Sequence, residues 1–301
     1  MKQSSLFLTL CLVFGSLAWG QAPTPEQVRQ SVAQSVIELK AQPMAVGGVE
    51  NRFVPSGSEP IAIRIYRPAA SSSAKSAALP IIYHIHGGAW VAGDLDTHDN
   101  ICRRLCHDAN AVVVAVNYRR PPEHPYPAST DDAMTVLSWI QANRATLSQS
   151  GPLILLGDSA GGNFVASTCL RNAESAKPIP IAAQVLVNPA LDIRPGSVTF
   201  KTYAMFINWG MPDMTKANEP YASPLVSTQL NKMPPTTIVV GEIDEIREDG
   251  VAMHQKLQAA GVKSTLFEQK GAGHFGPYWC ADHSSVKPAL TFVLGQIAAV
   301  K

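Results

Sequence analysis

The feature that most constrains the fold of this chain is a series of short apolar runs, each followed by glycine, asparagine or aspartate. These runs occupy residues 81–85, 111–116, 153–156, 183–187 and 237–240. An alternating segment at 61–66 precedes them, and a further run at 265–268 leads into a glycine. Apolar runs with little polar alternation are typical of strands that are buried on both faces.

Amphipathic stretches lie between these runs. Residues 131–143, 160–172, 248–260 and 285–299 all have the apolar spacing of helices. Strands that alternate with helices predict an α/β fold, with a mainly parallel sheet and helices on both faces. In such folds ligands bind beyond the carboxyl ends of the strands, which is where the polar residues fall.

Two segments do not fit the alternation. One, at 24–39, has the pattern of an amphipathic helix before any strand, and the other, at 194–233, is long and rich in proline and aromatic residues. Loops of that length are usually lids or binding segments. We interpret the two as one helical cap over the strand ends, from about 24–45 and 194–233. The alternative is two unrelated surface segments.

The segment Gly-Asp-Ser-Ala-Gly at 157–161 fits the pattern G-x-S-x-G. A buried strand precedes it and a helix follows, which is the context of a nucleophile elbow. The flanking glycines leave room for a sharp turn that raises the hydroxyl to the edge of the sheet. We therefore predict Ser159 as a catalytic nucleophile and Asp158 as a supporting residue. A serine that only caps a helix is the alternative.

A second glycine-rich segment, His-Gly-Gly-Ala-Trp, follows another buried strand. Small residues there let backbone N–H groups face a reacting carbonyl oxygen. The amides of Gly87, Gly88 and Ala89, together with that of Ala160, would form an oxyanion hole. His86 would brace this loop by hydrogen bonds and would not be the base. A plain glycine turn is the alternative.

A serine nucleophile needs a base and an acid that orients the base. His274 lies among glycines just after the last predicted strand, and Asp244 lies just after the preceding one. The chain order Ser159, Asp244, His274 is that of an α/β-hydrolase. Glu242 and Glu245 share the turn with Asp244 and are the competing carboxylates.

These motifs resemble the bacterial hormone-sensitive-lipase-like carboxylesterases, within the α/β-hydrolase superfamily, from about residue 60 to the C-terminus. Residues 117–128 are similar to the family segment Tyr-Arg-Leu-Ala-Pro-Glu-x-Pro-Phe-Pro-Ala. Residues 244–250 resemble the family's Asp-Pro-Leu-x-Asp-Glu-Gly, with Asp244 at the catalytic position. The resemblance implies an eight-stranded sheet, and a cap built from the N-terminal helices and an insertion. It also implies hydrolysis of short- to medium-chain carboxylic esters without a metal or cofactor.

Three positions depart from the family pattern. Ala89 stands at the third oxyanion glycine and keeps its N–H, so we expect no loss there. Glu245 replaces a proline beside Asp244 and adds a negative charge. The family's His-Gly-Phe is His-Phe-Gly at 274–276, a change that can alter the loop and the pocket wall.

The expected reaction is acyl transfer from a small-molecule ester through an acyl-enzyme on Ser159. An amidase or arylformamidase would use the same triad, so only substrates separate it from an esterase. A non-catalytic hydrolase-fold binding protein is the third interpretation. The related hormone receptors lack the catalytic histidine, and the presence of His274 argues against that class.

The charge balance excludes some partners. Lys and Arg number 24 and Asp and Glu 23, so the formal net charge is +1. This chain therefore lacks the basic excess of a nucleic-acid-binding surface. The sequence leaves the oligomeric state open, including a homodimer.

The N-terminus has the three-part pattern of a secretory signal peptide. Lys2 precedes an apolar run at 6–17, and Ala18 and Gly20 are small residues at −3 and −1 of a cleavage site. Cleavage would leave one domain, 21–301, secreted or periplasmic and without stable membrane insertion. An uncleaved anchor is the alternative.

Four cysteines remain after cleavage at that site. They are Cys102, Cys106, Cys169 and Cys280. An oxidising compartment permits disulfides, and the sequence does not choose between the three pairings. Buried free thiols are the simplest interpretation.

Overall fold

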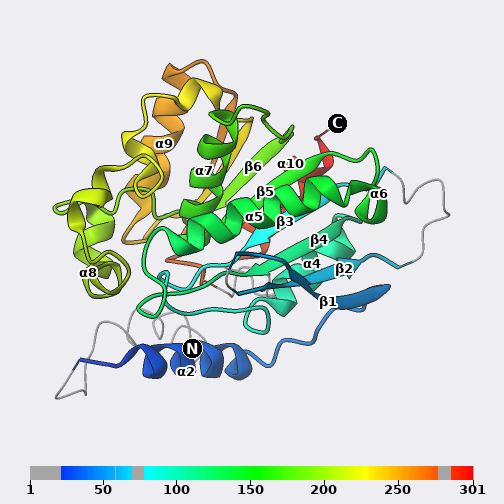
Figure 1. Cartoon of the computed structure of the whole chain (residues 1–301), viewed down its shortest axis with the longest axis horizontal. Helices are drawn as coiled ribbons and strands as arrows, with labels where there is room; N and C mark the ends of the chain where they lie inside the picture. The colour runs from blue at the N-terminus through cyan, green and yellow to red at the C-terminus, as the bar shows by residue number, and fades with distance from the viewer. Residues whose placement is uncertain (1–21, 58, 70–77, 277–285, 301) are drawn as a thin grey trace.

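The computed structural model describes residues 22–57, 59–69, 78–276 and 286–300. At its centre is an eight-stranded sheet in the order β1-β2-β4-β3-β5-β6-β7-β8 (Figure 1). The strands are β1 (Gly48–Val54), β2 (Ile61–Arg67), β3 (Ile81–Ile85), β4 (Val112–Asn117), β5 (Leu153–Asp158), β6 (Ala183–Val187), β7 (Thr236–Gly241) and β8 (Ser264–Gln269). The β1–β2 and β2–β4 pairs are antiparallel, and every pair from β4 to β8 is parallel. The predicted α/β fold with a mostly parallel eight-stranded sheet is confirmed.

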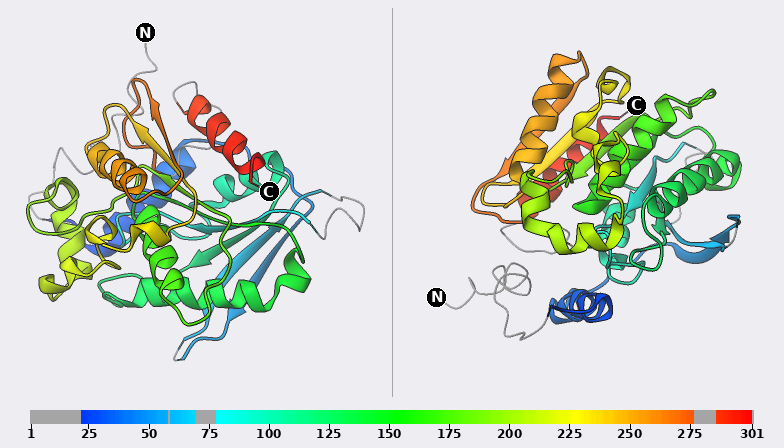
Figure 2. Two further views of the ribbon diagram at one scale, coloured as in Figure 1. Left: turned by 90° about the horizontal axis from the view of Figure 1, so that it is seen from above. Right: turned by 60° about the vertical axis from the view of Figure 1, so that its left-hand side comes forward.

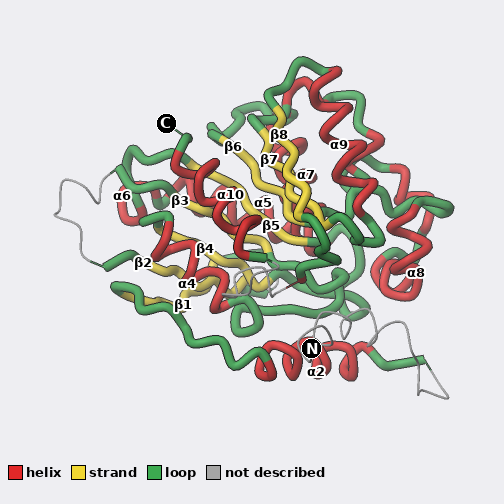
Figure 3. Tube along the Cα trace, turned by 180° about the vertical axis from the view of Figure 1, so that it is seen from behind, coloured by secondary structure: helices red, strands yellow, loops and turns green. Residues whose placement is uncertain are grey.

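Helices cover both faces of the sheet. The helices of the described residues are α2 (Pro25–Glu38), α4 (Asp99–Asp108), α5 (Ala128–Ala142), α6 (Arg144–Leu147), α7 (Ala160–Ala173), α8 (Val198–Gly210), α9 (Arg247–Ala259) and α10 (Lys287–Ala298). Helices α5 and α7 lie in front of the sheet in Figure 1, and α4 and α10 lie in front of it in the view from behind (Figure 3). Because both faces are covered, every residue of β3, β5, β6 and β7 is buried.

The sheet separates two apolar clusters. Alternate residues of β3 divide between them, so that Ile81 joins the cluster under α5 and α7 while Ile82 joins the one under α4 and α10. Full burial of one such side chain contributes about 1.5–3 kcal/mol. In the register, Ile85 pairs with Gly157. The segments that follow β3 and β5 therefore start side by side.

The helix α2 is held by a few specific contacts. It begins with a capping box, in which Thr24 and Gln27 exchange side-chain and backbone hydrogen bonds. Its Arg29 donates to the carbonyl oxygen of Val91 at 2.9 Å and pairs with Glu123 at 2.6 Å. Figure 2 shows α2 outside the two helical layers. These contacts tie it to segments that follow β3 and β4.

The long segment after β6 contains α8 and the short turns η1 (Met214–Asn218), η2 (Pro224–Val226) and η3 (Leu230–Lys232). It is also tied to the strand ends, because Tyr203 on α8 has its ring 6.4 Å from that of Trp90 and 6.2 Å from that of His274. Both segments that fall outside the alternation therefore contact the carboxyl edge of the sheet. Their role as one cap stays a prediction.

The sequence analysis did not anticipate β1. This edge strand alternates exposed and half-buried residues and carries Glu50 and Arg52 on its half-buried side. A strand without an apolar run gives no signal of burial, so it was not recognised.

Some predictions fall outside the described residues. The signal peptide, residues 1–20, and Cys280 are among them. The other cysteines are buried, Cys102 and Cys106 on α4 and Cys169 on α7. For Cys106 and Cys169 the structure confirms buried free thiols. Across the described ranges, no helix has the length and apolar character needed to cross a bilayer.

Candidate active site

Ser159 occupies a strained turn between β5 and α7. Its φ is 54° and its ψ is −121°, a combination that costs a non-glycine residue about 1–3 kcal/mol. The surroundings hold this conformation: the Ser159 N–H donates to the Val187 carbonyl oxygen at 2.8 Å, and its carbonyl oxygen accepts from Ala190 at 3.2 Å. This is the strand–turn–helix geometry expected of a nucleophile elbow.

The glycines around Ser159 are required by close backbone contacts. A Cβ on Gly157 would collide with the carbonyl oxygen of Gly161, and one on Gly161 would collide with that of Ile85. The spacing of G-x-S-x-G thus follows from the packing of α7 against β5 and β3.

The glycine-rich loop after β3, predicted to form the oxyanion hole, lies directly on this elbow. A Cβ on Gly87 would be 2.5 Å from Asp158 Oδ2 and 3.2 Å from Ser159 Cβ. Gly88 has a φ of 127°, and Ala89 has a φ of 50° although it carries a side chain. Within the described residues, the N–H groups of Gly88, Ala89 and Ala160 donate no hydrogen bond. Unpaired amides beside a serine hydroxyl are what an oxyanion hole needs.

His86, predicted to brace this loop, is completely enclosed. Its Nδ1 lies 2.8 Å from the Gly87 carbonyl oxygen, and its ring stacks on Tyr118 with centroids 4.2 Å apart. Burial lowers the pKa of His86 far below its ordinary value, so the ring is neutral. The backbone carbonyl of His86 also accepts from the Tyr118 hydroxyl at 3.0 Å.

Asp244 and His274 form a buried pair. His274 Nδ1 lies 3.0 Å from Asp244 Oδ1 and 3.1 Å from Oδ2. The same carboxylate accepts from the Asn188 side-chain amide and from the N–H of Ile246 at 3.1 Å. Three donors on one carboxylate hold it ionised and fixed in orientation.

The charges of this pair shift both pKa values. Burial alone would raise the pKa of Asp244, but the charge of His274 and the hydrogen bonds outweigh it and lower that pKa. Burial alone would lower the pKa of His274, but the charge of Asp244 and its hydrogen bond outweigh it, so that pKa is raised. With Nδ1 bound to the carboxylate, Nε2 of His274 is left to act as a base.

The structure distinguishes between the three carboxylates of the turn. Glu242 is exposed and bonds to Lys270 at 2.9 Å, away from His274. Glu245 is also exposed, and its charge contributes to the raised pKa of His274. Of the three, Asp244 is the carboxylate with a recorded hydrogen bond to the imidazole among the described residues.

Ser159 and His274 do not touch through a hydrogen bond in the part of the chain that the structure describes. Such bonds are often long in the absence of substrate and tighten in the complex. The catalytic roles of Ser159, Asp244 and His274 therefore remain predictions that the geometry supports.

Sequence reasoning missed two residues at this site. Asn188 follows β6 with a φ of 44° and holds Asp244 through its side-chain amide. Tyr203 on α8 lies between Trp90 and His274. An asparagine just after a buried strand is a weak signal for the first, and nothing in the sequence indicates the second.

The altered order at 274–276 has a structural consequence. Phe275 is buried in the apolar cluster under α4 and α10, and Gly276 has a φ of 49°. Phe275 is not among the residues that line the pocket described below. The change from the family's order therefore affects the loop and the core, and not this pocket wall.

An apolar pocket lies between α7, α8 and the segment that follows β4. Its walls include Trp90, Tyr126, Phe164, Phe206, Ile207 and Tyr221. The polar groups in the walls are already bonded: the Tyr126 hydroxyl donates to Glu219 and the Asn163 amide donates to two backbone carbonyls. Ser159 itself is not in the lining, but Trp90 follows the oxyanion loop and Phe164 lies one turn along α7 from Ser159. The pocket can thus take an apolar group of a molecule held at Ser159.

Among the residues that the structure describes, no group of three or more His, Cys, Asp or Glu side chains is arranged to hold a metal ion.

Comparisons with known proteins agree with this geometry. The family model described as the alpha/beta hydrolase fold matches residues 82–276. Esterase LipI of Mycobacterium tuberculosis is 34% identical over 238 residues, covering 75% of this chain and 71% of that protein. Carboxylesterase NlhH of the same species is 33% identical over 242 residues, covering 75% and 74%.

Among solved structures, the hyperthermophilic esterase of the archaeon Pyrobaculum calidifontis superposes with a TM-score of 0.83 at 28% identity, covering 92% of this chain and 95% of that one. The chain belongs to the family of the alpha/beta hydrolase fold, in its hormone-sensitive-lipase-like branch.

Proposed function

We propose that this protein is a carboxylesterase that cleaves short- to medium-chain carboxylic esters. Ser159 Oγ attacks the ester carbonyl while His274 Nε2 takes its proton, and Asp244 stabilises the imidazolium that forms. The amides of Gly88, Ala89 and Ala160 stabilise the oxyanion. The alcohol leaves with the proton from His274. His274 then takes a proton from water, which attacks the acyl-enzyme, and the carboxylic acid is released as Ser159 recovers its proton.

The observation that carries the proposal is the Asp244–His274 pair. A histidine whose Nδ1 is bound by both oxygens of a buried carboxylate is fixed in the tautomer that leaves Nε2 able to accept a proton. Relatives named as an esterase and a carboxylesterase support ester hydrolysis as the reaction.

The apolar pocket indicates the kind of ester. Its bonded polar groups offer nothing to a charged or strongly polar substituent, so the group that enters is uncharged. The aromatic and aliphatic side chains of its walls suit an alkyl chain or an aromatic ring of such an ester.

The experiment is a panel of p-nitrophenyl esters from acetate to palmitate, with the matched p-nitroanilides. We expect turnover of the short and medium esters and much slower turnover of the anilides. Ser159→Ala should reduce turnover by roughly 10⁴-fold or more, while Ser138→Ala, a change on the exposed side of α5, should not.

An organophosphate should add its mass to the wild-type protein at Ser159 only. Hydrolysis that survives Ser159→Ala, or a label on another residue, would refute the assignment. Anilides cleaved as fast as esters would make the protein an amidase.

We also propose that residues 1–20 direct export and are removed before Gln21, and that the segments 24–45 and 194–233 act together as the cap. The N-terminal sequence pattern supports the first. The contacts of Arg29 with Val91 and of Tyr203 with His274 support the second. The mass of the protein recovered from its native host tests export, because a mass that includes residues 1–20 rejects cleavage.

A further inference from the structure

The segment that follows β3 has a backbone conformation that its own residues disfavour. Ala89 has a φ of 50° and Trp90 a φ of 69°, so two adjacent residues with side chains are left-handed. Each is disfavoured roughly 10-fold relative to a right-handed residue. Because Ala89 supplies one of the amides predicted for the oxyanion hole, contacts from other elements must hold this segment in place.

Arginines hold the segment by alternate backbone carbonyls. Arg29 on α2 donates from Nε to the carbonyl oxygen of Val91 at 2.9 Å. Arg120, which follows β4, donates to the carbonyl oxygen of Gly93. These two guanidinium groups come from opposite ends of the fold's first half, yet they bind carbonyls only two residues apart.

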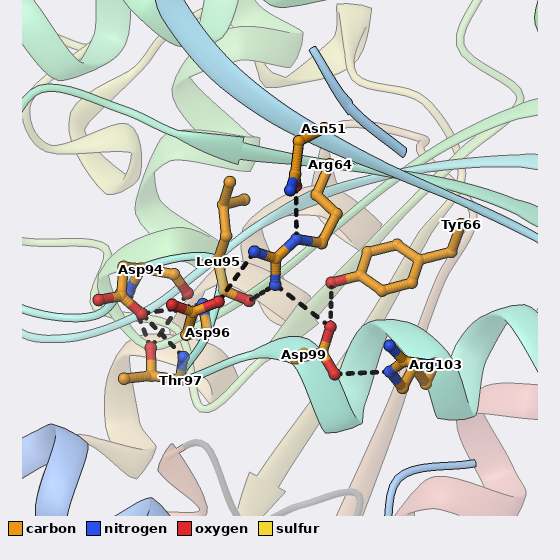
Figure 4. A network of polar contacts seen from close by, with 9 residues as sticks. All are labelled: Asn51, Arg64, Tyr66, Asp94, Leu95, Asp96, Thr97, Asp99 and Arg103. Carbon is orange, nitrogen blue, oxygen red and sulfur yellow. Dashed lines mark hydrogen bonds and ion pairs between the residues drawn. The ribbon is translucent and has the colours of Figure 1, made fainter. Parts of the chain in front are cut away.

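A third arginine fixes the far end of the segment. Arg64 on β2 donates from Nη1 to the carbonyl oxygen of Leu95 at 3.2 Å. Figure 4 shows the same guanidinium paired with Asp96 and Asp99, at 2.8 and 3.3 Å. The backbone beyond residue 93 is therefore anchored to the sheet, and Arg29 holds the carbonyl closest in sequence to Ala89.

The Val91 carbonyl is connected to the oxyanion hole through hydrogen-bonded peptide units. In a trans peptide the C=O and N–H bonds point in opposite directions, so the Ala92 N–H points away from Arg29. This N–H donates to the Gly88 carbonyl oxygen at 2.9 Å. The Gly88 carbonyl in turn shares its peptide unit with the Ala89 N–H, which donates no hydrogen bond among the described residues.

Arg29 therefore stands at one end of two linked peptide units, and an unpaired amide of the predicted oxyanion hole stands at the other. Hydrogen bonds in such a chain polarise one another. A positive charge at the carbonyl end thus orients the Ala89 N–H and also strengthens it as a donor.

The guanidinium of Arg29 is itself held rigidly. Nη1 and Nη2 bind the two carboxylate oxygens of Glu123 at 3.0 and 2.6 Å, and Nη2 also donates to the Pro121 carbonyl oxygen at 3.0 Å. A planar fork with several acceptors has little freedom to turn. Within the described ranges, every other recorded side-chain hydrogen bond of α2 and its N-cap joins residues of that same helix.

We propose that Arg29 is a positioning residue for ester hydrolysis, which aims the Ala89 N–H at the oxyanion through the peptide units of Val91 and Gly88. The inference rests on the proposed esterase function and gives α2 a part in the chemistry besides covering the strand ends. Removal of a whole oxyanion donor lowers kcat roughly 10²- to 10³-fold. Loss of Arg29 leaves the donor present but free to turn away, so we expect a smaller loss, roughly 10-fold.

The experiment compares a trifluoromethyl ketone with the matched trifluoromethyl carbinol as inhibitors of the full chain. Ser159 Oγ adds to the carbonyl carbon of the ketone, the carbonyl oxygen becomes an oxyanion, and the serine proton passes to His274. The carbinol has no carbonyl and forms no oxyanion, so it reports on pocket binding alone.

For Arg29→Met we expect Ki of the ketone to rise roughly 10-fold while Ki of the carbinol stays within about 2-fold. With p-nitrophenyl butyrate at pH 8, kcat should fall roughly 10-fold with KM changed less than about 3-fold. A merely structural role would lower the amount of folded protein without changing Ki of the ketone selectively.

Two control variants separate the backbone contact from the ion pair. Glu123→Gln removes the ion pair but leaves Arg29 its Val91 and Pro121 carbonyls, so kcat and Ki of the ketone should stay within about 3-fold of wild type. Arg67→Met is the matched control, because Arg67 at the end of β2 donates to two carbonyls beside α6 and should give wild-type values.

An unchanged Ki of the ketone in Arg29→Met overturns the inference alone. Equal losses in Glu123→Gln and Arg29→Met would mean that Arg29 only docks α2, which also overturns it. If Arg29→Met does not fold, Arg29→Lys keeps the charge beside Glu123 without the planar fork and must weaken ketone binding selectively, by at least about 3-fold. A wild-type protein that binds the ketone no more tightly than the carbinol and hydrolyses no ester would refute the proposed function, and this inference with it.

Discussion

Replacing Asp244 by asparagine keeps the shape of the side chain and removes its charge. In the structure His274 Nδ1 lies 3.0 Å from the nearer carboxylate oxygen. At that separation, with an effective dielectric constant of about 20, one charge pair is worth about 5.5 kcal/mol, or roughly 10⁴-fold in rate. Because the imidazolium exists only after His274 has taken the serine proton, this loss falls on the transition state. We expect kcat for Asp244→Asn to fall by roughly 10⁴-fold with KM little changed.

The assay is initial-rate hydrolysis of p-nitrophenyl butyrate at pH 8, with Glu242→Gln and Glu245→Gln as matched controls on the same turn. Each control should stay within about 3-fold of the wild-type protein, since both side chains are exposed. The pH profile supplies a second readout, because the loss of Asp244 should move the acid limb of Asp244→Asn to lower pH. An Asp244→Asn variant within 10-fold of wild type, or a control that abolishes activity, would show that another group orients His274.

Three further predictions follow from the same structure. Because the pKa of His274 is raised from 6.5, kcat/KM should fall as the pH drops through the region just above that value. Glu245→Gln should move this acid limb of the pH profile to lower pH, because it removes a charge that raises the pKa of His274. An acid limb that does not move in Glu245→Gln contradicts this prediction. Ile207→Trp should fill the pocket and so reduce the preference for long over short chains by roughly 10-fold or more. The measurement is the ratio of octanoyl to acetyl ester turnover, or of octyl to methyl ester turnover. The control Val198→Trp, at an exposed position of α8, should change neither ratio. Burial raises the pKa of Asp249 to about 6, above its value of 3.8 in an unfolded chain, so its contribution to stability is present at low pH and is lost as the pH rises through about 6. Asp249→Asn should therefore lower Tm more at pH 5 than at pH 8, and the opposite order would refute the sign.

The sequence predicted the central strands well because the physics of burial acts locally there. A strand such as β5, which is covered on both faces, must be apolar at every position until it reaches the site. The sequence therefore shows both the apolar run of the strand and the position where the strand ends. The same logic predicted Ser159, Asp244 and His274 as site residues, and they follow β5, β7 and β8. It failed for β1, whose half-buried side carries charged residues, and for Asn188, whose contact with Asp244 spans 56 positions.

The charge at Asp158 illustrates why part of the site cannot be predicted from the motif alone. The elbow turns Ser159 toward the substrate, while strand alternation points Asp158 to the opposite side of the sheet edge, with Leu156 and Ile154 toward α4. Asp158, the last residue of β5, is thus buried by the same geometry that presents the Ser159 hydroxyl to the substrate. The buried Asp158 carboxylate needs a hydrogen-bonding partner from another element. That partner is His98 at the start of α4, 60 positions away, whose Nε2 lies 3.4 Å from Asp158 Oδ2. Motif spacing specifies the turn, whereas only the folded structure shows that the aspartate inside the motif lies beside His98.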